Sequence, residues 1–215
     1  MVFRPKRGCV PIVGLSPACV RLINPHRYDV EFGMPRYILT GTAGGGKTAM
    51  LRLLEVNGLS VVEEAATDVI ALNQAMGQDR PWTEPSFIDQ IVALQRLREE
   101  NTQASEAEIV FFDRSPVCTL ALSRYSGFAP SRLLAEEVDR IQRASVYEPT
   151  VFFVRHQGFI QRTAARRITL EDAVEFERIH EQTYRELGFR LVDVPAGPLG
   201  DRVALIQQTL GLTVH

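Results

Sequence analysis

Eight consecutive residues near position 45 have the types and the spacing of a phosphate-binding loop. The pattern G-x-x-x-x-G-K-[ST] is matched at every fixed position by Gly41, Thr42, Ala43, Gly44, Gly45, Gly46, Lys47 and Thr48. Glycines let the backbone curl until successive N–H groups point inward toward an anion. A lysine ammonium then reaches the β- and γ-phosphates of a nucleoside triphosphate, and a threonine hydroxyl holds Mg²⁺. The motif therefore predicts ATP and Mg²⁺ as cofactors.

The sequence on either side of this loop fits the same interpretation. Residues 37–39 form a short apolar run that favours a strand, and residues 49–54 favour a helix beginning near Lys47. The amino end of such a helix carries a positive partial charge that attracts phosphate. We assign cofactor binding to residues 41–48 and to the next position, 49. The alternative is a glycine-rich turn that merely joins a strand to a helix, but the strand–loop–helix context favours phosphate binding.

Two glutamates follow the next expected strand, residues 59–62. In an open parallel sheet the carboxyl ends of the strands face the ligand crevice. We therefore predict that Glu64, rather than Glu63, lies beside the γ-phosphate as a general base or as a group that orients an acceptor hydroxyl. An equally good interpretation places this acid at a helix N-terminus, where the helix dipole stabilises it.

An acid and an arginine close another apolar run, residues 109–112. A buried central strand that ends in aspartate commonly delivers its carboxylate to Mg²⁺ or to the water shell of the metal, and we assign Asp113 this role. Arg114 carries a planar fork that could clamp a phosphate or an acidic group of an acceptor. The alternative for the two residues is a structural ion pair between neighbours at a strand end.

Arginines without any acid occupy the stretch between Gln157 and Leu170. We predict that Arg162 and Arg166 belong to a lid that closes over the transferring phosphates, where cations offset developing charge. The alternative is a solvated basic helix face.

The remaining periodicity predicts an α/β fold, a three-layer sandwich in which a five-stranded parallel sheet carries helices on both faces. The expected strands are residues 37–39, 59–62, 109–112, 150–154 and 189–194. The expected helices are residues 47–56, 67–76, 84–100, 130–146, 169–187 and 199–210, with a further helix after Pro116. In the helix over 84–100, the residues expected to face the core are Phe87, Ile88, Ile91, Leu94 and Leu97.

Composition excludes several classes of protein. The 215 residues carry a net charge of −2, so no global basic field recruits DNA or an anionic membrane. No run of about 18 apolar residues is present, which excludes a transmembrane helix. The three cysteines form no C-x-x-C pair, which fits a reducing, cytoplasmic compartment. The four histidines lack the spacing of zinc ligands.

Residues 1–33 differ from the rest of the chain. Four prolines, at positions 5, 11, 17 and 25, forbid a long helix, and basic residues outnumber acids. We predict an N-terminal extension, disordered or created by an over-extended start upstream of Met34, followed by one domain over 34–215. A secretory signal or an organelle transit peptide is a weaker alternative, because prolines interrupt the apolar stretch.

The order of these parts resembles the P-loop NTPase superfamily and, more closely, the NadR-like AAA-domain family of ATPases and kinases. Besides the phosphate-binding loop, the resemblance rests on residues 61–66, 81–85, 111–114, 162–167 and 184–195. It implies that Lys47 and Thr48 bind phosphate and metal. It also implies that Asp113 and Arg114 match the Asp-Arg element of deoxynucleoside-kinase-like proteins, and that Arg166 is a lid arginine.

Two departures from the family pattern concern the acceptor. Thr67 stands where relatives often carry arginine, and Thr163 stands where an acid often precedes the lid arginine. We therefore predict an ATP-dependent phosphotransferase that acts on an unidentified small-molecule acceptor of nucleoside or nucleotide type. The alternative is a nucleotide-dependent ATPase or GTPase switch that binds a protein or a phospholipid partner, because a phosphate-binding loop alone does not define an acceptor.

Overall fold

The structure, a computed structural model, describes residues 34–41, 44–102, 107–156 and 170–212. Five parallel strands form one sheet in the order β2-β3-β1-β4-β5. The strands are β1 (Arg36–Gly41), β2 (Ser60–Val62), β3 (Val110–Asp113), β4 (Thr150–Val154) and β5 (Arg190–Val194). The α/β prediction is confirmed. Strand order reverses at β1, and open parallel sheets bind ligands outside the carboxyl ends of the strands at such a point.

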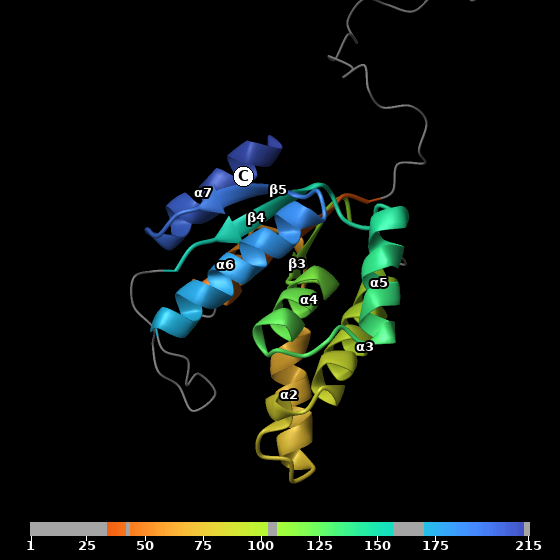
Figure 1. The fold of residues 1–215 in the computed structure, drawn as a ribbon. Coiled ribbons are helices and arrows are strands. Elements are labelled where there is room, and N and C mark those ends of the chain that lie inside the picture. The colour runs from red at the N-terminus through yellow and green to blue at the C-terminus, as the bar shows by residue number, and fades with distance from the viewer. Residues whose placement is uncertain (1–33, 42–43, 103–106, 157–169, 213–215) are drawn as a thin grey trace, which may run out of the picture. The chain divides into compact units, whose positions relative to one another are not determined.

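Helices cover both faces of this sheet (Figure 1). They are α1 (Lys47–Val56), α2 (Ala65–Ala75), α3 (Ser86–Asn101), α4 (Pro116–Tyr125), α5 (Arg132–Arg143), α6 (Leu170–Glu186) and α7 (Leu199–Leu210), with a 3₁₀ turn η1 (Pro81–Thr83). Because side chains alternate along a strand, neighbours in β1 enter different cores. Leu39 packs with α1 and α7, whereas Ile38 packs with α4, α5 and α6.

The helix boundaries differ slightly from the sequence prediction. Helix α2 begins at Ala65, two residues earlier than expected. Helix α3 begins at Ser86 because the preceding residues form η1. Helix α5 begins after Ser131, whose hydroxyl accepts a hydrogen bond from the Leu134 N–H at 3.1 Å, and it ends three residues early. A side-chain cap thus marks the start of α5, whereas apolar periodicity does not locate such a boundary.

One predicted core position is wrong. Phe87, Ile88 and Ile91 of α3 are buried as expected, but Leu97 is 53% exposed. The opposite face of this half of α3 is occupied by polar contacts, which turn Leu97 outward.

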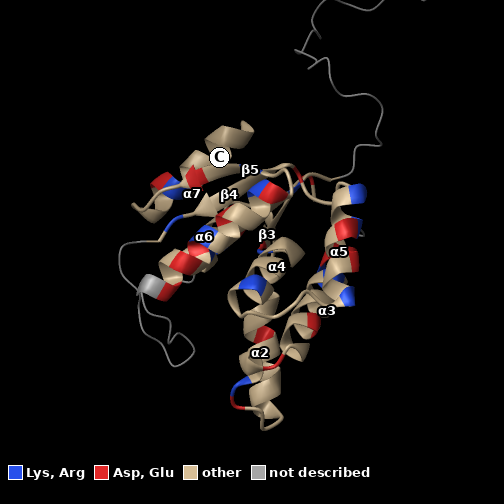
Figure 2. Ribbon diagram, in the orientation of Figure 1, with Lys and Arg blue, Asp and Glu red and all other residues tan. Residues whose placement is uncertain are grey.

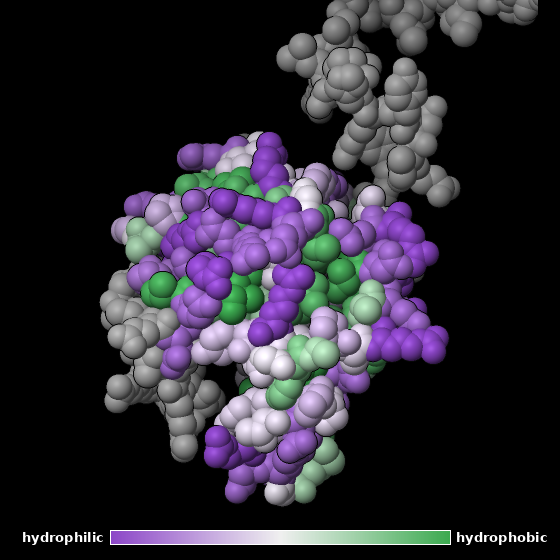
Figure 3. All heavy atoms as spheres, in the orientation of Figure 1, coloured by the Kyte–Doolittle hydropathy of each residue, from purple (hydrophilic) through white to green (hydrophobic). Residues whose placement is uncertain are grey.

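The visible face of the protein is largely hydrophilic, with hydrophobic residues showing between helices (Figure 3). Charges of both signs are interspersed along α5 and α6 (Figure 2).

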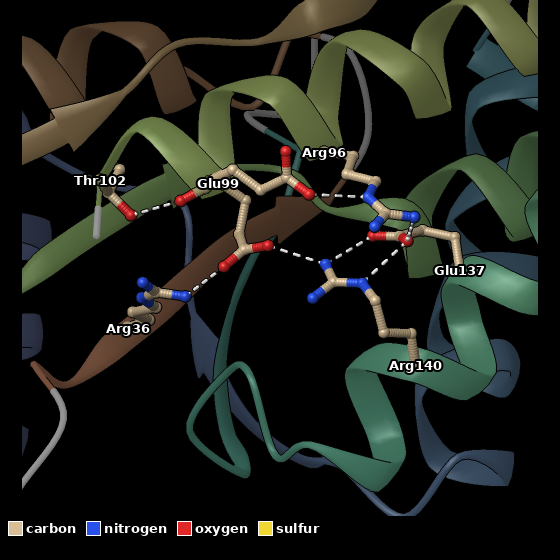
Figure 4. A network of polar contacts seen from close by, with 7 residues as sticks. Arg36, Arg96, Glu99, Thr102, Glu137 and Arg140 are labelled. Atoms are coloured by element: carbon tan, nitrogen blue, oxygen red, sulfur yellow. Dashed lines mark hydrogen bonds and ion pairs between the residues drawn. The ribbon is translucent and has the colours of Figure 1, made fainter. Parts of the chain in front are cut away.

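Two buried glutamates join α3 and α5 to the amino end of β1 (Figure 4). Glu99 accepts hydrogen bonds from Arg36 and, at 2.7 Å, from Arg140. Glu137 accepts a second bond from Arg140, also at 2.7 Å. Both carboxylates are almost fully inaccessible to water, so their charges require these partners. The network lies at the end of β1 opposite Gly41 and braces the sheet rather than the candidate site.

Candidate functional site

The glycine-rich loop presses against the end of β4. Gly41 has φ 121°, and a Cβ atom there would lie 2.1 Å from the carbonyl oxygen of Val154. A Cβ atom on Gly45 would lie 3.2 Å from the Val154 side chain. Gly44 and Gly46 also have positive φ. Only glycine fits this path without strain, which is the requirement that the motif predicted. Thr42 and Ala43 lie outside the described residues.

Lys47 begins α1 and is buried beneath the loop. Its ammonium donates a hydrogen bond to the Gly41 carbonyl at 3.1 Å, and its side chain spans the loop from end to end. Burial, with a further contribution from the nearby Arg114 guanidinium, lowers the pKa of Lys47 to about 8. Thr48 follows in the first turn of α1 and is exposed. A buried ammonium with a lowered pKa gains strongly from a polyphosphate anion.

Position 49, which was assigned to cofactor binding, is Ala49, an exposed residue of α1, so only its backbone N–H could contact a phosphate. A methyl side chain can neither donate a hydrogen bond to a phosphate nor offer an oxygen to Mg²⁺. Thr48 is therefore the residue that supplies a side-chain hydroxyl in the first turn of this helix.

Asp113 ends β3 directly beside the loop. It is the register partner of Leu39, two residues before Gly41. Its Oδ1 atom is buried and has no hydrogen-bond partner among the described residues. Burial raises the pKa of this carboxyl. A buried carboxylate oxygen without a partner is rare in native proteins and marks a place where a water, a ligand or an ion can bind.

Arg114 pairs with Glu64 rather than with its neighbour Asp113. Its Nε atom donates to Glu64 Oε1 at 2.5 Å, and the Thr67 hydroxyl donates to Glu64 Oε2 at 2.7 Å. Burial alone would raise the pKa of Glu64, but Arg114 and Lys47 lower it to about 2. The hypothesis of an ion pair between adjacent residues at this strand end is therefore wrong.

The two interpretations of Glu64 turn out to be compatible. Glu64 is the N-cap residue of α2, and its carboxylate also faces the site. Arg98 of α3 fixes the local backbone, because it donates to the carbonyl oxygens of Glu63 at 2.9 Å and Glu64 at 2.7 Å. Glu63 is exposed and pairs with Arg52 instead.

The sequence analysis missed two residues of α6 that reach the site. His180 Nε2 lies 3.4 Å from Arg114 Nη1. One turn later, the Tyr184 hydroxyl contacts Ser115 Oγ at 2.8 Å and Cys118 Sγ at 3.0 Å. Both side chains are fully buried. Their i, i+4 spacing places them on one face of a helix, but the sequence does not show what that face contacts.

Arg162 and Arg166, the two arginines predicted to belong to a lid, lie outside the described residues. Arg155, which follows β4, forms ion pairs with Glu177, Glu181 and Asp193.

In the described part of the chain, no three His, Cys, Asp or Glu side chains gather as a metal site. None of the described helices is long and apolar enough to cross a membrane.

The five-stranded parallel sheet and the glycine-rich loop after β1 define a P-loop α/β fold. A family model described as "AAA domain" matches residues 36–202, and the chain belongs to this family. Together with the structural neighbours, this match confirms the resemblance to NadR-like P-loop proteins. A search of curated proteins found no match.

Two solved structures show the shared fold. NadR in complex with NR superposes with a TM-score of 0.65 at 16% identity, over 84% of this chain and 53% of that chain. Deoxyadenosine kinase from M. mycoides, with the products dCMP and dCDP, gives a TM-score of 0.54 at 14% identity, over 82% of this chain and 98% of that chain. This chain thus spans about half the length of NadR.

Proposed function

We propose that the chain binds ATP and Mg²⁺ at the loop after β1 and transfers the γ-phosphoryl group to a hydroxyl of a small acceptor of nucleoside or nucleotide type. The observation that carries the proposal is the Glu64–Arg114 ion pair beside Asp113, whose Oδ1 atom has no partner among the described residues. A loop that only binds and releases a nucleotide does not need this second charged group next to it.

Lys47 and the loop would hold the triphosphate. The backbone N–H groups around Gly44–Gly46 and the amino end of α1 supply positive partial charge, and the Lys47 ammonium supplies a full one. Phosphoryl transfer needs mainly positioning and charge stabilisation, because the protein itself performs little covalent chemistry in this reaction.

The residues present fit a magnesium ion. Mg²⁺ is commonly bound by one or two protein oxygens together with substrate phosphates, so a cluster of three protein ligands is not required. Asp113 offers a buried oxygen without a partner, and Thr48 lies in the first turn of α1. The ion, when bound, would neutralise charge on the β- and γ-phosphates.

Glu64 and Arg114 would hold the acceptor. With a pKa of about 2, Glu64 is ionised at neutral pH and is a weak base. We therefore assign it the orientation of the acceptor hydroxyl, by accepting a hydrogen bond, in preference to full proton abstraction. The N–H groups of Arg114 that bind neither Glu64 nor His180 have no partner among the described residues and are available to an anionic or polar group of the acceptor.

The ligands of the similar structures support an acceptor of this type. Deoxyadenosine kinase was solved with dCTP, and NadR with NAD and AMP-PNP. Arg162 and Arg166 remain proposed lid residues that offset charge during transfer. We further propose a domain over 34–215 with an extension over 1–33. A cytoplasmic location goes with the proposal, because ATP is abundant there and the buried Cys118 thiol is free.

An acceptor screen tests the proposal. ATP consumption is measured with Mg²⁺ across nucleosides, nucleotides and vitamin precursors, for the natural chain, for Asp113→Asn and for Asp193→Asn. Stimulation by one compound in the natural chain and in Asp193→Asn, lost in Asp113→Asn while nucleotide still binds, supports a kinase. Slow hydrolysis that no compound stimulates supports the alternative of a switch with a protein or phospholipid partner.

A further inference from the structure

Arg114 has an unusual backbone, which makes its side-chain position dependent on its contacts. Its φ of 73° lies in the left-handed region, which a non-glycine residue rarely adopts. Its N–H group bonds to the Leu39 carbonyl at 3.0 Å, so β1 helps to hold this conformation. Strain of this kind persists only where the surrounding structure holds the conformation in place.

We infer that His180 is a positioning residue for the Arg114 guanidinium: as a neutral imidazole it accepts an Arg114 N–H and fixes the plane of the guanidinium beside the acceptor. The role of Arg114 in holding an acceptor rests on the proposed function. The contact between His180 and Arg114 does not.

The partners of His180 determine its tautomer. Its Nδ1 atom lies 3.1 Å from the Phe176 carbonyl oxygen, which can only accept, so Nδ1 carries the proton. Its Nε2 atom therefore has a lone pair, and it faces Arg114 Nη1, which can only donate. The Phe176 ring and the imidazole pack nearly perpendicular to each other, with 4.1 Å between centroids, which restricts rotation of the imidazole.

The electrostatics agree with a neutral imidazole. His180 is fully buried, and burial followed by the Arg114 and Lys47 charges lowers its pKa well below the ordinary value of 6.5. A protonated His180 would place an N–H group against the Arg114 guanidinium. The neutral form can accept from Arg114 at every pH near neutrality.

Two contacts are needed to fix a guanidinium. Glu64 accepts a hydrogen bond from Arg114 Nε. This one hydrogen bond still lets the guanidinium plane tilt, because the Glu64 side chain is itself 28% exposed. His180 holds Nη1 from the buried side, on a different helix. One turn further along α6, Tyr184 contacts Ser115 next to Arg114, so the same helix also fixes the adjacent residue. Helix α6 thereby sets the direction in which the unused N–H groups of Arg114 point.

Four variants separate this role from a merely structural one. His180→Gln keeps an acceptor near the place of Nε2. His180→Asn keeps a donor for the Phe176 carbonyl but is too short to reach Arg114, and His180→Leu removes both contacts. Thr183→Val is the matched control, because Thr183 is a buried residue of α6 that accepts from another arginine, Arg124, at 3.0 Å.

The Arg114 side chain is observed directly by ¹H–¹⁵N NMR of its Nε–H group, assigned by its loss in Arg114→Lys. We expect His180→Asn and His180→Leu to shift this resonance and to speed its hydrogen exchange at least about 10-fold. His180→Gln and Thr183→Val should leave it within about 2-fold. If His180→Leu does not fold, the comparison of His180→Asn with His180→Gln decides. An unchanged Nε–H resonance in His180→Asn overturns the inference.

Steady-state kinetics then separate the two proposals. With the nucleoside that stimulates ATP consumption in the screen, His180→Asn should raise the KM for that nucleoside about 10-fold and leave the KM for ATP unchanged, and His180→Gln should restore it. Equal effects on both KM values would overturn the positioning role. If no compound stimulates turnover, the proposed function fails, whereas the NMR result still decides the contact between His180 and Arg114.

Discussion

Arg114 Nε donates a hydrogen bond to Glu64 Oε1 at 2.5 Å, and this ion pair joins the ends of two neighbouring strands, β3 and β2. The Arg114 side chain is 13% exposed and the Glu64 side chain 28% exposed. Charges this poorly hydrated interact more strongly than a surface pair does, and neither can be removed without leaving the other short of a partner. The pair is therefore a defined structural unit at the edge of the sheet that faces the loop.

Removal of the Glu64 charge should impair acceptor turnover. Glu64→Gln keeps the shape of the side chain but abolishes the carboxylate that would receive the acceptor hydroxyl. We expect a loss of about 10²-fold in acceptor-dependent kcat, the size of effect that misplacing a reacting group produces. ATP affinity, measured by calorimetry, should stay within about 3-fold, because Glu64 would not contact the triphosphate.

Glu63→Gln is the matched control for this variant. Glu63 is adjacent in sequence but exposed, and it pairs with Arg52. Its substitution should change kcat by less than about 2-fold, since exposed ion pairs contribute little. Equal losses in the two variants would show that Glu64 has no special role.

Lys47 should take up a proton when a triphosphate binds. Its pKa of about 8 leaves roughly three quarters of the molecules with a neutral amine at pH 8.5. A bound polyphosphate favours the ammonium and raises this pKa. Calorimetry of ATP binding at pH 8.5 in two buffers with different heats of ionisation should therefore detect proton uptake. Lys47→Met should abolish the uptake and weaken binding at least about 10-fold, whereas Arg52→Met on the exposed face of α1 should do neither.

The same pKa gives the sign of the effect on stability. The folded-state pKa lies below the ordinary value of 10.5, so the folded protein holds fewer protons than the unfolded chain between pH 8 and 10.5. Lys47 thus costs stability below pH 8, and the cost disappears as the pH rises through this window. Lys47→Met is accordingly expected not to lower the thermal midpoint at pH 7. A lower thermal midpoint for Lys47→Met at pH 7 would contradict a destabilising effect of the buried Lys47 ammonium.

Alanine substitutions at Gly41 and Gly77 distinguish the cost of a steric clash from the cost of a positive φ alone. Both have positive φ, but a Cβ atom on Gly41 would collide with the Val154 carbonyl, whereas one on Gly77 would meet open space. We expect Gly41→Ala to lower the free energy of unfolding by about 2–4 kcal/mol, and Gly77→Ala by about 1 kcal/mol. Urea denaturation measures both. Similar losses would mean that the loop after β1 can move away from β4.

Local signals made much of this structure predictable. A buried apolar run followed by Asp113, or a glycine pattern followed by Lys47, depends on a few adjacent residues, and parallel topology brings all strand ends to one edge. The order of strands and helices along the chain and the placement of the loop were therefore predicted from the sequence alone, whereas the order of the strands in the sheet was not. Leu97 failed because apolar periodicity cannot show that polar partners occupy the other face of α3.

The partners of the site residues were not predictable in the same way. Glu64 and Arg114 are 50 residues apart, and Arg114 and His180 are 66 residues apart. No short pattern specifies such contacts, since they depend on how α6 packs across the sheet. The sequence left open an ion pair between Arg114 and Asp113, but Arg114, whose φ is 73°, pairs with Glu64 after β2 instead.

Glu99 should matter for stability and not for nucleotide binding. Glu99→Gln removes the buried carboxylate that pairs with Arg36 and leaves Arg140 with Glu137 alone, and breaking a buried pair costs about 3–5 kcal/mol. Glu100→Gln is the control, because Glu100 is 46% exposed and pairs with Arg96 in an i, i+4 contact worth less than about 0.5 kcal/mol. Urea denaturation gives both values.

Calorimetry then tests the separation of this network from the loop. The ionic contacts lie at the Arg36 end of β1, and the glycine-rich loop begins at the other end, so a folded Glu99→Gln protein should bind ATP with an affinity within about 3-fold of the natural chain. If the stability of Glu99→Gln is close to that of the natural chain, water must reach the charges of Arg36 and Arg140. A large loss of ATP affinity without unfolding would show that β1 transmits its position from one end to the other.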